Sequence, residues 1–455
     1  MSKLFGTDGI RGIANQYPMT PQFATQLGIV ATNRLSGKRK VKIVVGKDTR
    51  VSSDMLESAL IAGITSAGGD VLKVGVLPTP GIAYLTKSLS AHAGIVISAS
   101  HNPFDNNGIK FFGPNGLKLN DKIEEEIEAC LIEACLVSEG LILPTGDGIG
   151  KVIDVRDAHT QYSHFVIESI HNSLDFNGEK IVIDCANGAT SFVAPSLFEE
   201  LGAEVILINC SPNGININLN CGSLHPELTA EVVKTQKAML GLCFDGDGDR
   251  VIVIDELGNV VDGDFIMAIC AKYFKENNML NNNLVVTTVM SNIGFYIALK
   301  ALGIDIITTK VGDRYVVEQM LEKGAVLGGE QSGHIIFSDH FLTGDGIITS
   351  LQLLTIIQRL SMPLSKLTQI MKKYPQVLIN VRVRDTKTNL ETLPELQSAI
   401  KAGEEVLKDE GRILVRYSGT EPLCRVMVEG PTEEEINKTA KNIVSVIERE
   451  LGNRE

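Results

Sequence analysis

The sequence predicts an α/β protein with three similar α/β domains followed by a small α+β domain. Its 455 residues are enough for three or four domains of ordinary size. Hydrophobic residues make up 44% of the chain and charged residues 21%, which is typical of a globular protein that buries more than one core. Two further observations support the prediction: one pattern of apolar runs occurs three times, and the chain changes character near Met371.

The repeated pattern begins with β-branched runs at Lys42, Lys180 and Leu284, each followed by a helix-compatible segment, a glycine and a second β-branched run. Continuous apolar strands joined by helices are typical of parallel or mixed sheets covered on both faces. A later apolar strand in each repeat leads into a polar loop: Ser98-Ala-Ser-His-Asn-Pro103, Asp245-Gly-Asp-Gly-Asp-Arg250 and Gly328-Gly-Glu-Gln-Ser-Gly-His334. Since ligands of such folds bind beyond the carboxyl ends of strands, the three loops could face one shared site. The alternative is a coincidence of common βαβ units.

The last 85 residues, from Met371, show a different pattern. The runs Val377–Val383 and Arg412–Tyr417 alternate as half-exposed strands do, and Leu423–Val428 follows a turn. Pro431 then begins an amphipathic helix with acids in its first turn, where the helix dipole favours them. This region is predicted to be a small antiparallel α+β domain.

Charge and composition exclude several classes of protein. The chain has 42 Lys and Arg against 55 Asp and Glu, a formal net charge of −13, and its only basic cluster is the short Lys38–Lys40. Nucleic acid and anionic membranes are therefore poor partners. The N-terminus lacks the apolar core of a signal peptide, and no apolar run is long enough to span a bilayer. The eight cysteines are scattered without a CxxC pair, so we expect reduced thiols and a cytoplasmic location.

Asp245-Gly-Asp-Gly-Asp-Arg250 places three acids at alternate positions. Such carboxylates repel one another, by about 1 kcal/mol per pair in water and more at reduced dielectric, unless a cation lies among them. The glycines allow a tight loop to turn all three toward one point. Oxygen-only ligands suit a hard ion such as Mg²⁺ or Ca²⁺. Arg250 stands where a calcium EF-hand loop needs glycine, so that motif is excluded; an acidic surface turn is the alternative.

The other polar loops also suggest chemistry. Ser100 suits a nucleophile or a carrier of phosphate, with a helix or turn cap as the alternative. His101 beside it suits a base, although a lone histidine is more often a structural group. No Gly-x-Ser-x-Gly segment occurs, which argues against an acyl-transfer hydrolase. The mixture of donors and acceptors in Gly328–His334 suits a polyhydroxylated ligand such as a sugar, or else a polar turn.

A fourth segment, Arg416-Tyr-Ser-Gly-Thr-Glu-Pro422 followed by Arg425, combines two guanidiniums, two hydroxyls and backbone N–H groups. These groups suit a phosphate, while the alternative is a hairpin turn with exposed arginines. An acidic protein that binds an anion needs a local basic pocket. The candidate cations for such a pocket are Arg11, Lys110, Arg250, Arg416 and Arg425.

Together these segments, with Thr7-Asp-Gly-Ile-Arg-Gly12 at the start, resemble the α-D-phosphohexomutase superfamily over essentially the whole chain. All four signature loops of that superfamily are present. Within it, Leu4-Phe-Gly-Thr-Asp-Gly-Ile-Arg-Gly12 and Gly329-Glu-Gln-Ser-Gly-His334 resemble the phosphoglucosamine mutase branch. The phosphomannomutase/phosphoglucomutase branch, which is the alternative, tends to carry Met at the place of Gln331.

The resemblance implies four domains around a central cleft, and we expect them over residues 1–154, 155–254, 255–370 and 371–455. It also implies a role for each loop. Ser100 matches the phosphorylated serine, whose phosphate would complete a Mg²⁺ site with Asp245, Asp247 and Asp249. Glu330 and Ser332 match residues that hold sugar hydroxyls. The loop that grips the non-reacting phosphate is matched by Arg416, Ser418, Gly419, Thr420 and Arg425. The groups around the reacting phosphoryl group are matched by Arg11, His101, Lys110, Arg250 and His334.

The implied reaction interconverts glucosamine 6-phosphate and glucosamine 1-phosphate through phosphoserine 100 and a hexosamine 1,6-bisphosphate. One Mg²⁺ per chain, a hexose 1,6-bisphosphate activator and phosphorylation of Ser100 are expected, in a monomer or homodimer. Lys110, His101 and His334 all remain candidates for the general base. Two other functions stay open: mutase activity on glucose or mannose phosphates, and a metal-dependent phosphatase or non-catalytic sugar-phosphate binding protein.

Overall fold

The computed structural model describes residues 4–6, 8–36, 40–136, 143–170, 174–384, 388–418 and 422–452. The chain forms two compact units. The larger unit contains Met1–Met290 and Ile304–Gln369, and the smaller unit contains Ser291–Gly303 and Ile370–Glu455.

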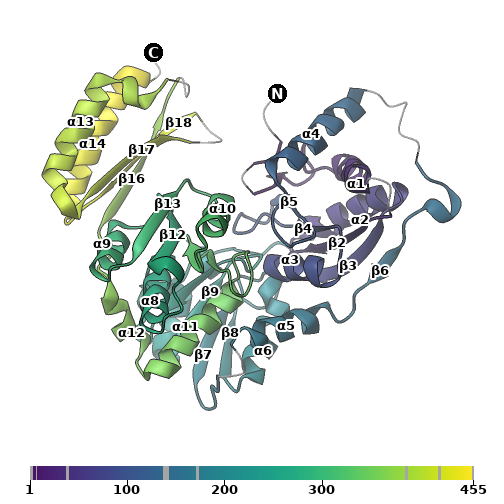
Figure 1. Cartoon of the computed structure of the whole chain (residues 1–455), viewed down its shortest axis with the longest axis horizontal. Coiled ribbons are helices and arrows are strands. Elements are labelled where there is room, and N and C mark those ends of the chain that lie inside the picture. The colour runs from purple at the N-terminus through teal and green to yellow at the C-terminus, as the bar shows by residue number, and fades with distance from the viewer. Residues whose placement is uncertain are drawn as a thin grey trace. The chain divides into compact units, whose positions relative to one another are not determined.

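Three sheets of the larger unit contain the same four-strand core (Figure 1). In each sheet, the four core strands are counted in chain order. Core strand 1 pairs in parallel with core strands 2 and 3, and core strand 4 pairs antiparallel with core strand 3. In the first sheet these strands are β2 (Lys42–Lys47), β3 (Asp70–Val76), β4 (Ala93–Ile97) and β5 (Asn106–Phe112). In the second they are β7 (Lys180–Asp184), β8 (Glu204–Ile208), β9 (Leu240–Phe244) and β10 (Val251–Ile254). In the third they are β12 (Leu284–Thr288), β13 (Asp305–Thr309), β14 (Leu327–Gly329) and β15 (Ile335–Phe337). The shared order confirms the prediction of three similar α/β domains with mixed sheets.

Short strands extend two of these cores. β1 (Ile10–Ile13) pairs with β5, β6 (Val152–Asp154) with β3, and β11 (Val260–Val261) with β10. The helices that connect the strands are α1 (Pro21–Ser36), α2 (Val51–Ser66), α3 (Thr79–Ser88), α4 (Asp121–Leu136), α5 (Ala158–Glu168), α6 (Ala194–Glu200), α7 (Glu227–Gln236), α8 (Gly263–Glu276), α10 (Asp313–Lys323), α11 (Gly346–Leu360) and α12 (Leu364–Leu367).

The apolar strands form the centres of the sheets. All five residues of β4, of β9 and of β12 are buried, as expected for strands covered on both faces. Aspartates begin two of the helices, because a side-chain oxygen can accept from the unpaired N–H groups of the first turn. Asp262 caps α8 in this way, and Asp345 caps α11 by accepting from the backbone of Ile347 and Ile348.

The smaller unit contains α9 (Ile293–Ala301) and the predicted antiparallel sheet. Its strands are β16 (Gln376–Arg382), β17 (Arg412–Tyr417) and β18 (Leu423–Glu429), with β18 in the middle. Helices α13 (Pro394–Leu407) and α14 (Glu433–Leu451) complete it. The Thr432 side chain caps α14 by accepting from the backbone N–H of Glu435, one of the acids predicted at this helix start. These elements confirm the predicted α+β domain.

Among the described residues, no single helix is both long and apolar enough to cross a membrane. A bent pair, Gly346–Leu360 with Leu364–Ile370, meets the length and composition criteria together, but most of α11 is buried within the fold.

Candidate active site

The three predicted loops occupy the same position in the three sheets, between the third and fourth core strands. Direct contacts bring them together. Ser100 of the first loop contacts Asp245 of the second, and the backbone N–H of Val251 donates to the carbonyl of Gly333 in the third at 3.2 Å. The repeated topology therefore converges three sequence-distant loops on one site, as the shared position after the third strand predicts.

Ser100 lies at the centre of this site and is 1% exposed. Its Oγ donates a 2.7 Å hydrogen bond to Asp245 Oδ2 and lies 3.3 Å from Nδ1 of His101. Its backbone has φ +53°, in the left-handed region that serine rarely adopts. The backbone N–H donates to Ser98 Oγ at 2.9 Å. Ser100 is thus a buried hydroxyl held in an unusual conformation beside a carboxylate.

The predicted acidic loop folds into a carboxylate cluster. One oxygen from each of Asp245, Asp247 and Asp249 lies within 4.8 Å of the others. The loop requires glycine at Gly246, because a Cβ there would lie 2.7 Å from the carbonyl oxygen of Ser100. Gly248 has φ +71°, which a side chain would disfavour.

The charges of this cluster are only partly compensated by protein groups. Burial and the charges of Asp249 and Asp247 raise the pKa of Asp245 well above its ordinary value. Burial also acts to raise the pKa of Asp249, but Lys110, His334 and Arg250 lower it overall. Among the described residues, Asp247 Oδ1 and Asp249 Oδ1 have no hydrogen-bond partner although both are buried. Oxygen ligands left without partners in a three-carboxylate cluster fit a hard divalent cation.

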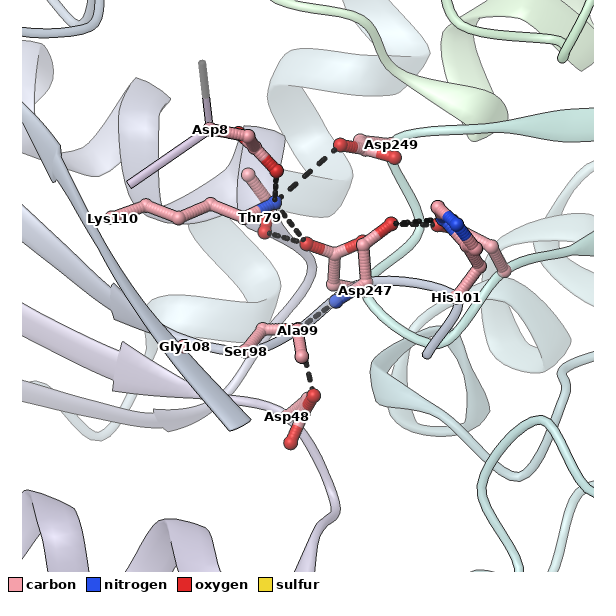
Figure 2. A network of polar contacts seen from close by, with 12 residues as sticks. Asp8, Asp48, Thr79, Ser98, Ala99, His101, Gly108, Lys110, Asp247 and Asp249 are labelled. Atoms are coloured by element: carbon pink, nitrogen blue, oxygen red, sulfur yellow. Dashed lines mark hydrogen bonds and ion pairs between the residues drawn. The ribbon is translucent and has the colours of Figure 1, made fainter. Parts of the chain in front are cut away.

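Lys110 supplies the protein's own positive charge to the cluster (Figure 2). Its Nζ lies 2.8 Å from Asp247 Oδ2, 3.0 Å from Asp8 Oδ2 and 3.7 Å from Asp249 Oδ2. Burial alone would lower the pKa of this ammonium, but the three carboxylates raise it well above the usual value. Lys110 is therefore a buried, charged group between Asp8 of the opening segment and the second loop. Thr79 also reaches the cluster, donating from Oγ1 to Asp247 Oδ2 at 2.6 Å.

A chain of alternating charges continues from Lys110 toward the third loop. Asp8 pairs with Lys118 as well as with Lys110, and Lys118 Nζ lies 2.7 Å from Asp313 Oδ2. Asp313 lies 3.7 Å from Nε2 of His334, whose Nδ1 lies 3.6 Å from Asp249. Burial acts to lower the pKa of His334, but its contacts with Asp249 and the charges of Asp313 and Glu330 raise it overall.

The remaining predicted groups of the reacting site lie around this network. Arg11 pairs with Asp8 and donates to Asn102 Oδ1 at 3.3 Å. Arg250 Nε lies 3.7 Å from Asp249 Oδ1. Burial, followed by the charges of Arg250 and Arg11, lowers the pKa of His101 to about 4. The structure thus brings all five predicted residues around the reacting phosphoryl group into the vicinity of Ser100 and the acidic cluster.

The two predicted sugar-binding residues lie in the loop that carries His334. Glu330 Oε1 accepts from the backbone N–H of Gly312 at 3.2 Å, and the Glu330 N–H donates to the His334 carbonyl. Ser332 Oγ is buried, and no described residue forms a hydrogen bond with it. A hydroxyl with unused hydrogen-bonding capacity beside a carboxylate is suited to a polyhydroxylated ligand.

The predicted phosphate loop belongs to the smaller unit. Arg416 and Arg425 lie directly opposite each other on β17 and β18, and Arg425 donates to Ser418 Oγ at 3.3 Å. Burial and the charge of Arg425 lower the pKa of Arg416. Like charges opposite each other destabilise a strand pair, and an anion between them would remove that repulsion. Gly419 and Thr420 lie outside the described residues.

Four residues of the site were not singled out from the sequence: Asp8, Thr79, Lys118 and Asp313. Asp8 belongs to the opening segment Thr7–Gly12, where its position beside Arg11 was the available signal. The other three follow ordinary strands or turns. Only the assembled sheets show that Thr79 contacts the acidic cluster and that Lys118 and Asp313 join the charge network around it.

Four family models match the chain. They are alpha/beta/alpha domains I, II and III of phosphoglucomutase/phosphomannomutase, at residues 2–134, 160–258 and 262–374, and the C-terminal domain of the same family, at residues 378–446. The matches show the four expected domains in the expected order. The domain boundaries we set from the sequence remain predictions.

Curated relatives and solved structures agree with these models. The chain is 53% identical to phosphoglucosamine mutase of Pelobacter propionicus, over 100% of both chains. It is 51% identical to phosphoglucosamine mutase of Geobacillus kaustophilus, over 99% of this chain and 100% of that protein. A phosphoglucomutase/phosphomannomutase family protein of Burkholderia thailandensis shares the fold with TM-score 0.80 and 24% identity over 100% of both chains. A putative phosphomannomutase of Thermus thermophilus shares it with TM-score 0.76 and 23% identity over 98% of each chain.

The four matching domain models assign the sequence to this family, and the full-length identity above 50% assigns it to one branch of the family. The chain belongs to the phosphoglucosamine mutases, isomerases of the phosphoglucomutase/phosphomannomutase family.

Proposed function

We propose that this chain interconverts glucosamine 6-phosphate and glucosamine 1-phosphate, with Ser100 as the carrier of the transferred phosphoryl group. The name of the full-length relatives supports the substrate. The observation that supports the mechanism most strongly is the 2.7 Å hydrogen bond from the buried Ser100 hydroxyl to Asp245, within a cluster of three carboxylates. This geometry suits an oxygen that gains and loses a phosphoryl group beside a cation.

The first step transfers the phosphoryl group from phosphoserine 100 to the free hydroxyl of the sugar monophosphate. The bond between Ser100 Oγ and phosphorus breaks while a bond from the sugar oxygen to phosphorus forms, giving a hexosamine 1,6-bisphosphate. In the second step the other phosphate of this bisphosphate returns to Ser100 after the sugar has turned end for end. The net reaction moves a phosphoryl group between the two ends of the sugar and leaves Ser100 phosphorylated. A hexose 1,6-bisphosphate would load Ser100 by the same chemistry and would in this way act as an activator.

A base must accept the proton of the attacking hydroxyl. His101 is one candidate, because the pKa of its ring is lowered to about 4 and a neutral imidazole has a nitrogen free to accept a proton near pH 7. Its Nδ1 lies 3.3 Å from Ser100 Oγ, the oxygen that leaves in the first step and attacks in the second. Lys110, whose three carboxylate contacts favour the charged form, is suited instead to neutralise the transferring oxygens. The raised pKa of His334 suits a second positive charge.

One Mg²⁺ per chain would be held by Asp245, Asp247, Asp249 and the phosphate on Ser100. When bound, it supplies positive charge that offsets the negative charge on the transferring phosphoryl oxygens. The oxygen-only donor set and the two buried carboxylate oxygens without hydrogen-bond partners support this ion over a softer metal. Arg11 and Arg250, which also lie at this site, add charge from the protein itself.

The substrate would be recognised at both ends. Glu330 and Ser332 would hold the sugar hydroxyls, since both lie in the glycine-flanked third loop with polar atoms available. The non-reacting phosphate would be held by Arg416, Ser418, Gly419, Thr420 and Arg425. The facing guanidiniums of Arg416 and Arg425 support this assignment. The partner of the chain is thus a small sugar phosphate, bound by a monomer or homodimer.

The test is a phosphorus NMR assay with Mg²⁺ and a trace of hexose 1,6-bisphosphate. Glucosamine 6-phosphate, glucose 6-phosphate and mannose 6-phosphate are supplied separately. We expect fast, preferential formation of glucosamine 1-phosphate. Preference for glucose or mannose phosphate would overturn the proposed substrate. Release of inorganic phosphate without a 1-phosphate would instead indicate a phosphatase, and binding without turnover would indicate a non-catalytic sugar-phosphate protein.

A further inference from the structure

We propose that Arg50 and Asn218 are positioning residues that fix Ser100 for phosphoryl transfer by holding its main-chain carbonyl. This inference rests on the proposed function of Ser100. Both side chains donate to the same oxygen: Arg50 Nη2 and Asn218 Nδ2 each lie 2.9 Å from the carbonyl oxygen of Ser100.

The conformation of Ser100 explains why such a clamp is needed. A left-handed φ of +53° is costly for a serine and persists only when its surroundings determine it. Glycine would adopt this conformation freely, but the proposed chemistry requires a hydroxyl at this position. The surrounding contacts must therefore stabilise the turn.

Arg50 stabilises the turn from the first α/β domain, where it directly precedes α2. All five of its N–H groups have acceptors: Nε pairs with Asp48 at 2.9 Å, and the four Nη hydrogens serve main-chain carbonyls of the loop. Those carbonyls belong to Ser100, Asn102, Pro103 and Asn106. Asp48 in turn accepts from Ser98 Oγ at 2.7 Å (Figure 2). Ser98 Oγ accepts from the Ser100 N–H. A buried, fully used guanidinium thus fixes the path of the loop on both sides of Ser100.

Asn218 holds the same turn from the second α/β domain. It lies in the segment that follows β8, has φ +58°, and donates from Nδ2 to the carbonyls of Ser100 and Asn102. The Ser100 carbonyl also lies against Gly246 of the acidic loop, where a Cβ would approach it to 2.7 Å. Asn218 therefore locks the serine loop against the domain that carries Asp245, Asp247 and Asp249.

Movement of this carbonyl would rotate the Ser100 peptide and move Oγ relative to Asp245 and the transferring phosphoryl group. Displacement of a reacting group by about 1 Å can reduce a rate by about 10²-fold, because in-line transfer depends on alignment. The sugar-binding side chains Glu330 and Ser332 lie in another loop. Loss of the clamp should therefore lower kcat and leave KM for the sugar phosphate little changed.

The test compares Asn218→Gly with Asn220→Gly. Asn220 lies in the same segment with φ +51° but is exposed. Both substitutions therefore relieve a similar backbone strain, but only Asn218→Gly removes a side-chain amide that donates to the Ser100 carbonyl. We expect kcat of Asn218→Gly to fall about 10-fold or more, with KM within about twofold and an unchanged Tm. Asn220→Gly should retain wild-type kcat. Equal kcat values for the two variants would overturn the inference.

Asn218→Asp and Arg50→Lys extend the test. The aspartate places a negative charge against two carbonyl oxygens, and we expect a larger loss of kcat, about 30- to 100-fold, whereas Asn220→Asp should be silent. Lysine offers three donors in place of a planar five-donor fork and should not restore wild-type kcat even where Arg50→Lys folds. A wild-type kcat for Asn218→Asp would contradict the clamp even if the glycine variants proved ambiguous.

Failure of this inference can be distinguished from failure of the proposed function by including Ser100→Ala. If Ser100→Ala abolishes turnover and both Asn218 variants turn over at the wild-type rate, Ser100 carries the phosphate but the clamp is wrong. If Ser100→Ala retains turnover, the proposed mechanism itself is wrong. Intact mass spectrometry during incubation with a hexose 1,6-bisphosphate gives a second readout, since the Asn218 variants should reach the phosphorylated state of Ser100 more slowly than the wild type, and Ser100→Ala should not reach it.

Discussion

Charge is arranged in opposite ways in the two units of this chain. In the larger unit, acids and bases alternate near Ser100, from Asp249 through Lys110, Asp8 and Lys118 to Asp313. In the smaller unit, two arginines, Arg416 and Arg425, lie opposite each other on neighbouring strands. The first arrangement is a preorganised network in which each charge stabilises its neighbours. The second has like charges side by side, and an anion bound between them would reduce their repulsion.

Two buried carboxyls of the larger unit, Asp8 and Asp345, also differ in how neighbouring charges affect their pKa values. Asp8 is buried, which acts to raise its pKa, yet Lys110, Lys118 and Arg11 lower it well below the ordinary value. Asp345 is also buried but has no such cation, and burial raises its pKa to about 6. At Asp8 the neighbouring cations therefore outweigh the effect of burial, whereas at Asp345 the effect of burial prevails.

The largest effect is expected from the acidic cluster itself. Asp247→Asn removes one charge from the three carboxylates, so Mg²⁺ affinity and turnover should fall together, with turnover lower by about 10²- to 10³-fold. Initial rates across a Mg²⁺ titration measure both. Thr79→Val is the matched control, since it removes a hydrogen bond to Asp247 but no charge. Wild-type turnover in excess chelator would contradict the metal assignment.

The second test breaks the alternating network at Lys110. Lys110→Met keeps the length of the side chain but leaves Asp8, Asp247 and Asp249 without their shared cation. We expect kcat to fall about 10²-fold and the free energy of unfolding to fall by about 3 kcal/mol, because a buried charge is left unpaired. Steady-state kinetics and urea unfolding measure the two effects. A Lys110→Met variant as stable as the wild type would show that the network is not held together by this ammonium.

The third test addresses the facing arginines of the smaller unit. Arg425→Ala should raise KM for the sugar phosphate about 10- to 100-fold, the loss expected for charged hydrogen bonds worth about 1.5–3 kcal/mol, with a smaller change in kcat. Stability should stay equal or increase, because repulsion with Arg416 disappears. Arg382→Ala, an exposed arginine in the same sheet, is the control. Equal KM values for the two variants would remove the phosphate assignment.

The smallest effect concerns stability and pH at Asp345. A carboxyl with a raised pKa in the folded chain binds its proton more tightly there than in the unfolded chain. The free energy of unfolding therefore falls by up to about 3 kcal/mol as pH rises from about 4 to about 6. Above about pH 6 this contribution of Asp345 does not change further. Asp345→Asn retains an oxygen to cap α11 and should be more stable than the wild type at pH 7 but equal near pH 4. Urea unfolding at both pH values measures this, and a pH-independent difference would contradict it.

Local signals allowed much of this structure to be predicted. The apolar runs at Lys42, Lys180 and Leu284 correctly indicated three repeated sheets, because buried strands have continuous apolar sequence. The spacing of Asp245, Asp247 and Asp249 indicated a carboxylate cluster. Three acids so close in sequence repel one another unless a cation lies among them, so the motif predicts a cation site without further information.

The supporting residues could not be predicted because their roles depend on how the sheets assemble. Asn218 is one asparagine among several in a polar segment, and only the tertiary structure brings it to the Ser100 carbonyl. Thr79 and Asp313 begin helices and reach the cluster only through contacts more than 20 residues away in sequence. Arg50 resembles an ordinary residue at a helix start until its five acceptors are seen.

The most direct test of the account is a single-turnover transfer experiment. The enzyme is loaded with a hexose 1,6-bisphosphate carrying labelled phosphate, freed of excess ligand, mixed with glucosamine 6-phosphate and quenched at successive times. The account predicts label on Ser100 at the start, its movement to a hexosamine bisphosphate within one turnover, and no loading or turnover in Ser100→Ala. Label on another residue, or a Ser100→Ala enzyme that turns over at the wild-type rate, would contradict it.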